Sequence, residues 1–260
     1  MADSRIGYHP DLAQNERNHA LRCAIIKAFD WNRRNEIFYS DIGHVFPGII
    51  PPAAPEFDAL ADRHSITRDV GGAISLLRNS GWTAGNLPVL EYGFASSVTE
   101  RQMFEQFRSF LADIGYPGEK IRPLLFASYG DYAQGIINRK VMLITQGWTM
   151  DFPDAENTMQ LFFGPNASPG SNSANYNSEE FDHLFRTSAT MTPSPKRTAL
   201  YRKMNNLVIR DCSTLSGVSR TMVLLWNREF AMLPDRNFVG GYFFRFVGVA
   251  ADSGGGEVSP

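Results

Sequence analysis

The sequence contains few cysteines and no long hydrophobic run. Only Cys23 and Cys212 occur among its 260 residues, far apart and each within a helix-like pattern. This spacing is not typical of a disulfide framework or a thiolate metal site, so we expect both cysteines to be small buried apolar residues. The longest apolar stretches, Val141–Ile144 and Met222–Trp226, are too short to span a bilayer, and we expect no export signal or anchor in the chain as written.

The chain also lacks a strong excess of charge of either sign. Its 25 Lys and Arg residues and 27 Asp and Glu residues leave a formal net charge of -2, and neither sign forms a long block. A nucleic acid or an anionic membrane is therefore a poor candidate partner. A hydrophobic content of 43% with 12% aromatic residues does support a globular core.

The common motifs of catalytic and metal sites are absent as well. The sequence has no G-x-S-x-G, G-x-G-x-x-G or G-x-x-x-x-G-K-[ST] motif, the commonest signals of hydrolases, dinucleotide-binding proteins and NTPases. None of the five histidines belongs to an i, i+4 pair of histidines or to a clustered Cys/His spacing. We expect no metal site, no cofactor and no enzymatic activity.

What the sequence does contain is an alternation of helix and strand patterns. Such alternation predicts an α/β fold with a mostly parallel or mixed sheet covered by helices, with ligand sites beyond the strand ends. Thr99 and Gln102 predict a capping box at the start of the best-patterned helix. The predicted helices are Arg17–Phe29, Val70–Asn79, Thr99–Gly115, Asp131–Asn138, Glu179–Thr187 and Lys196–Asp211, and the predicted strands are Leu87–Phe94, Ile121–Ala127, Val141–Thr145 and Val218–Trp226.

The most informative stretch is Gly147–Asn157, which directly follows a predicted strand. Trp148 offers a broad apolar surface with one N–H donor, and Asp151 offers a fixed negative charge to a cationic group. A carboxylate after a strand is also a common N-cap or turn residue, so a purely structural role stays open at this stage. Asp154 and Glu156 are better explained as capping residues of a helix running through Met159 to Phe163, because acidic side chains favour the positive N-terminus of a helix.

Several blocks, in the same order, resemble the extracytoplasmic solute-binding proteins of peptide-type ABC importers, the oligopeptide- and dipeptide-binding family known as solute-binding family 5. The resemblance covers roughly Asn18 to Phe238. The blocks that carry it are Gly147-Trp148-x-x-Asp151-Phe152-Pro153-Asp154-Ala155-Glu156-Asn157 with Leu161-Phe162-Phe163, Asn175-Tyr176-Asn177-Ser178-Glu179-Glu180-Phe181-Asp182, Leu21-Arg22-x-Ala24-x-x-x-Ala28-Phe29-Asp30, Ala73 to Trp82, and Arg197-x-x-Leu200-Tyr201.

This resemblance implies a periplasmic-binding-protein-like fold of type 2, but only its second lobe. Family chains are considerably longer than this one. We expect a lead segment at 1–17, the second lobe with its mixed sheet and flanking helices at 18–236, a C-terminal return segment toward an absent first lobe at 237–250, and a disordered tail at 251–260. A lone lobe leaves its cleft face exposed, which should lower its ligand affinity.

The resemblance also implies a passive receptor that works outside the cytoplasm and delivers a peptide or other small solute to an ABC permease in the membrane. Asp151 stands where peptide binders pair with the ligand's α-ammonium, and the backbone of 147–149 stands where they pair with the peptide main chain. Phe152 keeps the ring of a tyrosine that is common at its position. The candidate ligand contacts are Asp151, Trp148, Gly147, Thr149, Phe152 and Asn175.

Two alternatives remain open. Relatives with the same fold take nickel complexes, sugars or other solutes, so the ligand class is not decided. The same fold is also sometimes attached to a DNA-binding helix-turn-helix, where it serves as a cytoplasmic small-molecule-sensing or regulatory domain. The absence of a helix-turn-helix pattern or a basic face in this sequence counts against that alternative.

Overall fold

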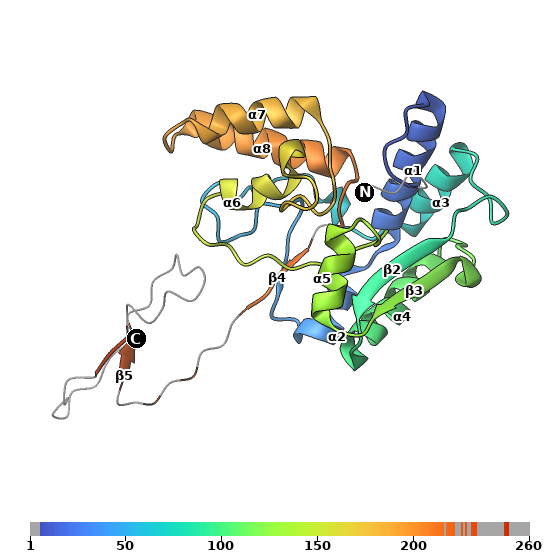
Figure 1. Ribbon diagram of the computed structural model, residues 1–260, viewed down its shortest axis with the longest axis horizontal. Helices are drawn as coiled ribbons and strands as arrows, with labels where there is room; N and C mark the ends of the chain where they lie inside the picture. Colours follow the sequence, from blue (N-terminus) through green and yellow to red (C-terminus); the bar gives the residue numbers. More distant parts are fainter. Residues whose placement is uncertain are drawn as a thin grey trace.

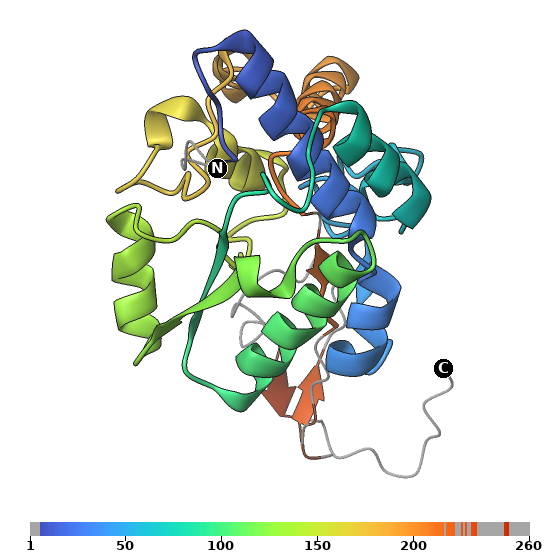
Figure 2. The ribbon, with the colours of Figure 1, turned by 90° about the vertical axis from the view of Figure 1, so that its right-hand side faces the viewer.

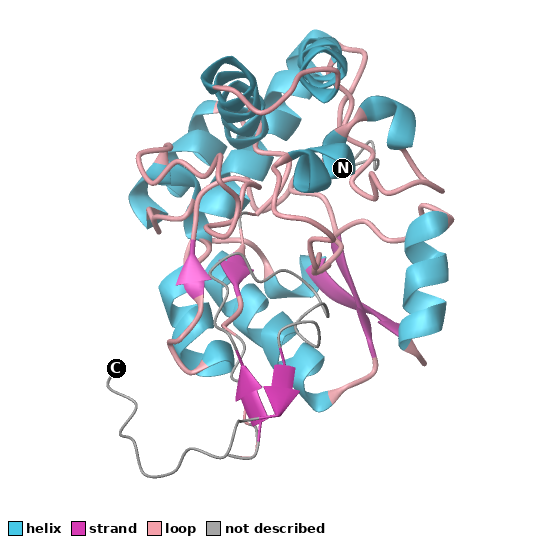
Figure 3. Cartoon of the chain, turned by 90° about the vertical axis from the view of Figure 1, so that its left-hand side faces the viewer, coloured by secondary structure: helices cyan, strands magenta, loops and turns pink. Residues whose placement is uncertain are grey.

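The computed structural model describes residues 6–215, 217–221, 225, 227, 230–232 and 247–249. Most of the regular structure is helical, and the longest strands are β2 (Leu90–Ala95) and β3 (Ile121–Phe126) (Figure 3). The elements gather around two hydrophobic clusters. α1 (Leu12–Ala28), α3 (Val70–Asn79) and α4 (Val98–Ala112) surround the first, while α7 (Glu179–Ala189) and α8 (Pro195–Arg210) lie side by side over the second (Figures 1 and 2).

The remaining elements are short. Further helices are α2 (Trp31–Tyr39), α5 (Tyr129–Ile137) and α6 (Glu156–Met159), with 3-10 turns at Arg63–Ser65, Gly118–Lys120, Gln160–Phe162 and Gly164–Asn166. The remaining strands are β1 (His44–Val45), β4 (Val218–Ser219), β5 (Phe230–Met232) and β6 (Val247–Val249). β1 pairs antiparallel with β4, and β5 pairs antiparallel with β6.

β2 and β3 are parallel and in register from Leu90 opposite Ile121 to Ala95 opposite Phe126. The strand predicted at 141–145 is wrong in extent, because only Leu143 forms a parallel bridge to β2. Beyond Leu143 the backbone of Thr145 no longer bonds to β2. Its N–H donates to the Tyr132 hydroxyl (2.8 Å), and that hydroxyl donates to its carbonyl (3.0 Å). A side chain from α5 thus ends the strand.

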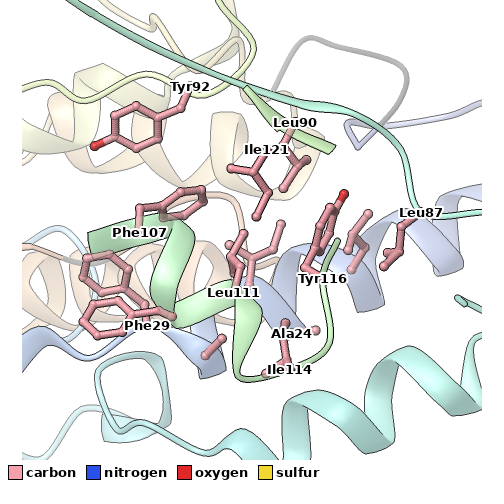
Figure 4. Packing of buried hydrophobic residues seen from close by; sticks show 14 of the residues in the cluster. Ala24, Phe29, Leu87, Leu90, Tyr92, Phe107, Leu111, Ile114, Tyr116 and Ile121 are labelled. Carbon is pink, nitrogen blue, oxygen red and sulfur yellow. The ribbon is translucent and has the colours of Figure 1, made fainter. Parts of the chain in front are cut away.

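The first core lies between α4 and the β2–β3 pair. The apolar stripe predicted for α4 is buried, and Figure 4 shows Phe107 and Leu111 of this helix facing Leu90 and Ile121 of the two strands. Phe107 is 1% exposed and packs its ring against Tyr92 at 5.1 Å between centroids. This packing holds β2 against α4 and so fixes the end of β2 from which the candidate site is built.

The helix cap predicted for α4 is in the wrong register. Ser97, not Thr99, is the N-cap: its backbone is extended and its hydroxyl accepts a hydrogen bond from the Glu100 N–H (3.0 Å). The sequence contains two overlapping capping patterns, starting at Ser97 and at Thr99, and only the first is used. The helix cap therefore lies two residues earlier than predicted, and α4 begins at Val98.

The cysteines contradict their prediction. Cys23 in α1 and Cys212 just after α8 form a disulfide across 189 residues, and both are partly exposed rather than buried. Their local patterns did look helical, but Cys212 lies in a turn beyond the helix end, with a left-handed backbone (φ 48°). That turn brings its side chain to α1, a long-range contact that local periodicity does not predict.

Several predicted boundaries lie outside the described residues or differ from the structure. α1 begins at Leu12 with Asp11 as N-cap, earlier than the expected Arg17, and Ile6 is fully buried in the first core. Of the strand predicted at 218–226, the structure describes only β4 as a strand. The expected return segment and tail lie outside the described residues, except β6. Within the described part, no helix combines the length and the apolar character needed to cross a bilayer.

Candidate functional site

The candidate site is a turn that crosses from one hydrophobic core to the other. Met142 is buried in the first core and Met150 in the second, each about one-twentieth exposed. Because Leu143 runs parallel to β2, the residues after it leave the sheet at the carboxyl end of that strand. This is the end of an α/β sheet where ligands usually bind.

The crossing segment is fixed by polar contacts as well as by its two buried methionines. The Thr145 hydroxyl donates to the Tyr92 hydroxyl (2.7 Å), and the Thr145 backbone is held by Tyr132. Burial raises the pKa of Tyr132 well above its usual value, so this hydroxyl keeps its proton and can donate and accept at once. The start of the turn is therefore held in one place by two tyrosines.

Asn157 organises the other end of the turn, although it is not among the predicted ligand contacts. It is 1% exposed, and its side-chain oxygen accepts from the Trp148 indole N–H (2.7 Å) and from the Asp151 backbone N–H (3.3 Å). Its amide nitrogen donates to Oδ2 of Asp151 (3.3 Å). One buried amide thus joins the aromatic and the carboxylate, the two side chains singled out from the sequence. The available signal was its place as the last residue of the Gly147–Asn157 block.

The turn presents most of the predicted contact residues to solvent. Trp148 is 42% exposed and Phe152 is 45% exposed, and Gly147, Thr149 and Asp151 are exposed too. No Lys or Arg among the described residues forms a salt bridge with Asp151. An exposed carboxylate between two exposed rings suits a ligand with a cationic group and apolar surface.

Asp154 and Glu156 do not cap a helix in the way predicted. α6 begins at Glu156 and its N-cap, Ala155, makes no side-chain cap bond. Both carboxylates instead pair with the Arg197 guanidinium of α8, at 2.5 Å from Asp154 and 3.2 Å from Glu156. A second oxygen of Asp154 does accept the Glu156 N–H (2.9 Å), so it retains a local turn role. The positive charge of Arg197, a residue outside the predicted site, therefore orients the carboxylates of Asp154 and Glu156 toward α8.

Arg197 is the centre of a buried ionic cluster beneath the site. It is 5% exposed, and Glu56, 6% exposed, lies 3.8 Å from its guanidinium and accepts the Ala155 N–H (3.1 Å). Burial disfavours the positive charge, but the hydrogen bond to Asp154 and the nearby negative groups more than compensate and raise the pKa of Arg197. The turn is thereby tied to α8 and to the loop that contains Glu56.

Asn175 occupies a different loop from Asp151. Its backbone is left-handed (φ 50°), its side-chain oxygen accepts the Ser168 N–H (3.1 Å), and its amide nitrogen donates to the Ser168 hydroxyl (3.3 Å) and the Ser173 carbonyl (3.1 Å). Each of these bonds closes the 168–175 loop on itself. The structure shows this loop-stabilising role, and a ligand contact by Asn175 stays a prediction.

Comparison with known families gives this arrangement a context. Residues 12–170, more than half of the chain, match the family described as bacterial extracellular solute-binding proteins, family 5 Middle. The chain belongs to family 5 of the bacterial extracellular solute-binding proteins. The predicted family and the predicted solute-binding-protein fold are therefore confirmed. Members of family 5 are extracytoplasmic binding proteins.

Solved structures show the same fold at low sequence identity. The periplasmic binding protein DppA from Helicobacter pylori, in complex with the peptide STSA, is 19% identical with a TM-score of 0.66, over 78% of this chain and 39% of that one. HbpA2 from Haemophilus parasuis is 19% identical with a TM-score of 0.74, over 90% of this chain and 45% of that one. The chain thus spans less than half the length of these two proteins. No curated protein matches the sequence.

A third solved structure has a comparable extent. A protein described as the peptide-binding protein of a peptide ABC transporter is 16% identical with a TM-score of 0.64, and the match covers 81% of this chain and 95% of that one. The matched fold therefore occurs in a solved chain of similar size as well as within longer relatives.

Proposed function

We propose that this chain is a solute-binding component of an ABC importer, and that its solute is a peptide with a free α-amino group, bound without chemical conversion. The observation that carries the proposal is the exposed carboxylate of Asp151, which lacks a salt-bridge partner among the described residues and is held next to Trp148 by Asn157. An ammonium group would supply the missing countercharge.

The backbone beside Asp151 supports a peptide over a sugar or a nickel complex. The N–H groups of Gly147, Trp148 and Thr149 have no hydrogen-bond partner among the described residues, and these residues are exposed. Free main-chain donors next to a charged anchor suit an extended peptide that adds as a strand, since main-chain pairing gives affinity without selecting side chains. The peptide complex of H. pylori DppA is consistent with this ligand class.

The disulfide supports an extracytoplasmic site of action and disfavours the cytoplasmic sensor. Disulfides persist in oxidising compartments and are rare in the cytosol. The Cys23–Cys212 bond joins α1 to the end of α8 and so ties the two cores together. Its persistence in the purified chain would fit the location of the other family members.

The proposal is tested by NMR titration of the 260-residue chain with trialanine and with N-acetyl-trialanine. The free amine should bind more tightly, and Asp151→Asn should remove that preference. Because Asp151 is exposed, the charge pair should contribute about 0.2–1 kcal/mol, which is a 1.4- to 5-fold difference in Kd at about 0.6 kcal/mol for RT. Closure by another lobe would enlarge this difference in Kd, because it would bury the charge pair.

The matched control is Glu119→Gln, which neutralises an exposed carboxylate before the start of β3, at the opposite end of the strands. This variant should keep the preference for the free amine. An equal preference in the Asp151→Asn chain and the unmodified chain would contradict the α-ammonium role. Binding of both peptides with no shift at residues 147–157 would contradict the peptide site itself.

A further inference from the structure

A histidine and both cysteines meet at one point, away from the candidate peptide site. The ring of His19 and the sulfurs of Cys23 and Cys212 offer ligand atoms that all lie within 4.8 Å of one another. His19 and Cys23 are one turn apart on α1, and Nε2 of His19 lies 3.5 Å from Sγ of Cys23. Cys212 comes from the turn after α8. The expectation of no clustered Cys/His spacing does not hold here: His19 and Cys23 are four residues apart, and their third partner, Cys212, is distant in the chain.

One imidazole and two thiolates form a ligand set typical of zinc, with water as the usual fourth ligand where a site is open to solvent. All three residues are partly exposed, so a metal ion and a water molecule have access. Zinc–sulfur bonds of about 2.3 Å and zinc–nitrogen bonds of about 2.0 Å in a tetrahedron place ligand atoms about 3.5–3.8 Å apart. The spacing of His19 and Cys23 already fits this range.

We propose that His19, Cys23 and Cys212 form a redox-controlled zinc site. In the oxidised chain the two sulfurs are bonded to each other and hold α1 against the end of α8. A dithiol reductant supplies two electrons and two protons, which convert the disulfide into two thiols while the reductant becomes a disulfide. Zinc then displaces the two thiol protons, binds both sulfurs and Nε2 of His19, and joins the same two elements.

Zinc binding would replace an existing contact of the His19 ring. Nε2 of His19 lies 2.9 Å from the Arg210 carbonyl, to which it can donate in the oxidised chain. Zinc binding requires this nitrogen to be unprotonated, so the proton moves to Nδ1 and the contact with Arg210 is lost. The neighbouring turn keeps a second attachment to α1, because the Arg22 guanidinium donates to the Asp211 carbonyl (3.1 Å). The site can therefore open at the sulfurs while α1 and the turn stay together.

The test is a zinc titration of the full chain, reduced with a phosphine under argon, against a chromogenic chelator. Reduced chain should take up one zinc ion and oxidised chain none, and cobalt should give the absorption bands of a thiolate complex. His19→Ala should weaken zinc binding by about tenfold or more, and Cys212→Ser should weaken it further. The control His183→Ala, an exposed histidine on α7, should bind zinc as tightly as the unmodified chain.

Zinc uptake that is equal in His19→Ala and in the unmodified reduced chain would overturn the proposal, as would no uptake by reduced chain. A second measurement covers the case in which reduction loosens the fold. Zinc should then raise the thermal midpoint of reduced chain but not of reduced Cys212→Ser, and failure to raise it would also overturn the site. Neither result depends on Asp151 or on peptide binding.

Discussion

Replacement of Arg197 by methionine should destabilise the chain far more than loss of a surface charge. The guanidinium side chain is 6% exposed, and it faces side chains of Glu56, Asp154 and Glu156 that are 7%, 22% and 37% exposed. Removing the cation leaves the Glu56 charge buried with two further carboxylates nearby. Breaking a buried ion pair in this way costs about 3–5 kcal/mol.

The expected loss is large enough for simple assays. At about 2–4 °C per kcal/mol for a chain of this size, the thermal midpoint should fall by about 6–20 °C, and urea unfolding should shift to a lower midpoint. The indole N–H signal of Trp148 should also move, because Asp154 and Glu156 lie just before Asn157, whose side chain accepts that N–H. A structural effect would thereby be seen at the site itself.

The matched control is Lys203→Met on the same helix. Lys203 pairs with Glu180 at 2.8 Å, but their side chains are 55% and 47% exposed, so the cost should be about 0–1 kcal/mol. Glu56→Gln combined with Arg197→Met should recover part of the loss, because it removes the unpaired buried charge. Equal destabilisation by Arg197→Met and Lys203→Met would refute the buried-cluster argument. So would the absence of any recovery in the variant that combines Glu56→Gln with Arg197→Met.

Two further predictions concern the framework of the site. Ser97→Ala should cost about 1 kcal/mol in the free energy of unfolding, whereas Thr99→Ala should cost little, because only Ser97 caps α4; equal costs in urea unfolding would restore the rejected capping register. Burial raises the pKa of Tyr116 and of Tyr132. At a pH where both have ionised in the unfolded chain, they therefore remain protonated in the folded chain. Stability should therefore be complete below the unfolded pKa of about 10 and fall as pH rises above it, and Tyr116→Phe should reduce the slope of that fall in thermal unfolding between pH 9 and 11.

Local sequence patterns predicted the parts of the fold that local forces determine. The stripe on α4 is buried because its apolar residues recur at helical spacing. β3 lies within its predicted stretch, and β2 overlaps its own but extends one residue further, to Ala95. The predicted length of the third strand, 141–145, was wrong for a reason that the local sequence does not show. Tyr132, from a separate helix, takes the backbone groups of Thr145 that a longer strand would have given to β2.

The same distinction applies to the candidate site. Trp148 and Asp151 were detectable because an aromatic and a carboxylate next to Gly and Pro conflict with local preferences. Asn157 is visible in the sequence only as the last residue of the Gly147–Asn157 block, because its role comes from three hydrogen bonds that form only once the turn is folded. Asp154 and Glu156 were assigned to a helix end because their partner, Arg197, is some forty residues further along the chain.

The position of the site between two cores explains how an exposed turn can be rigid. Met142 and Met150 bury themselves in different hydrophobic clusters, so the residues between them must cross from one to the other. That crossing exposes Trp148 on a segment whose ends are both fixed, and Asn157 orients its indole. A ligand that meets such a turn loses little free energy to ordering it, because the protein is already ordered before binding. Asn157→Ala should therefore weaken peptide binding without removing any group that touches the peptide, whereas unchanged affinity would mean that the two methionine anchors alone position the turn.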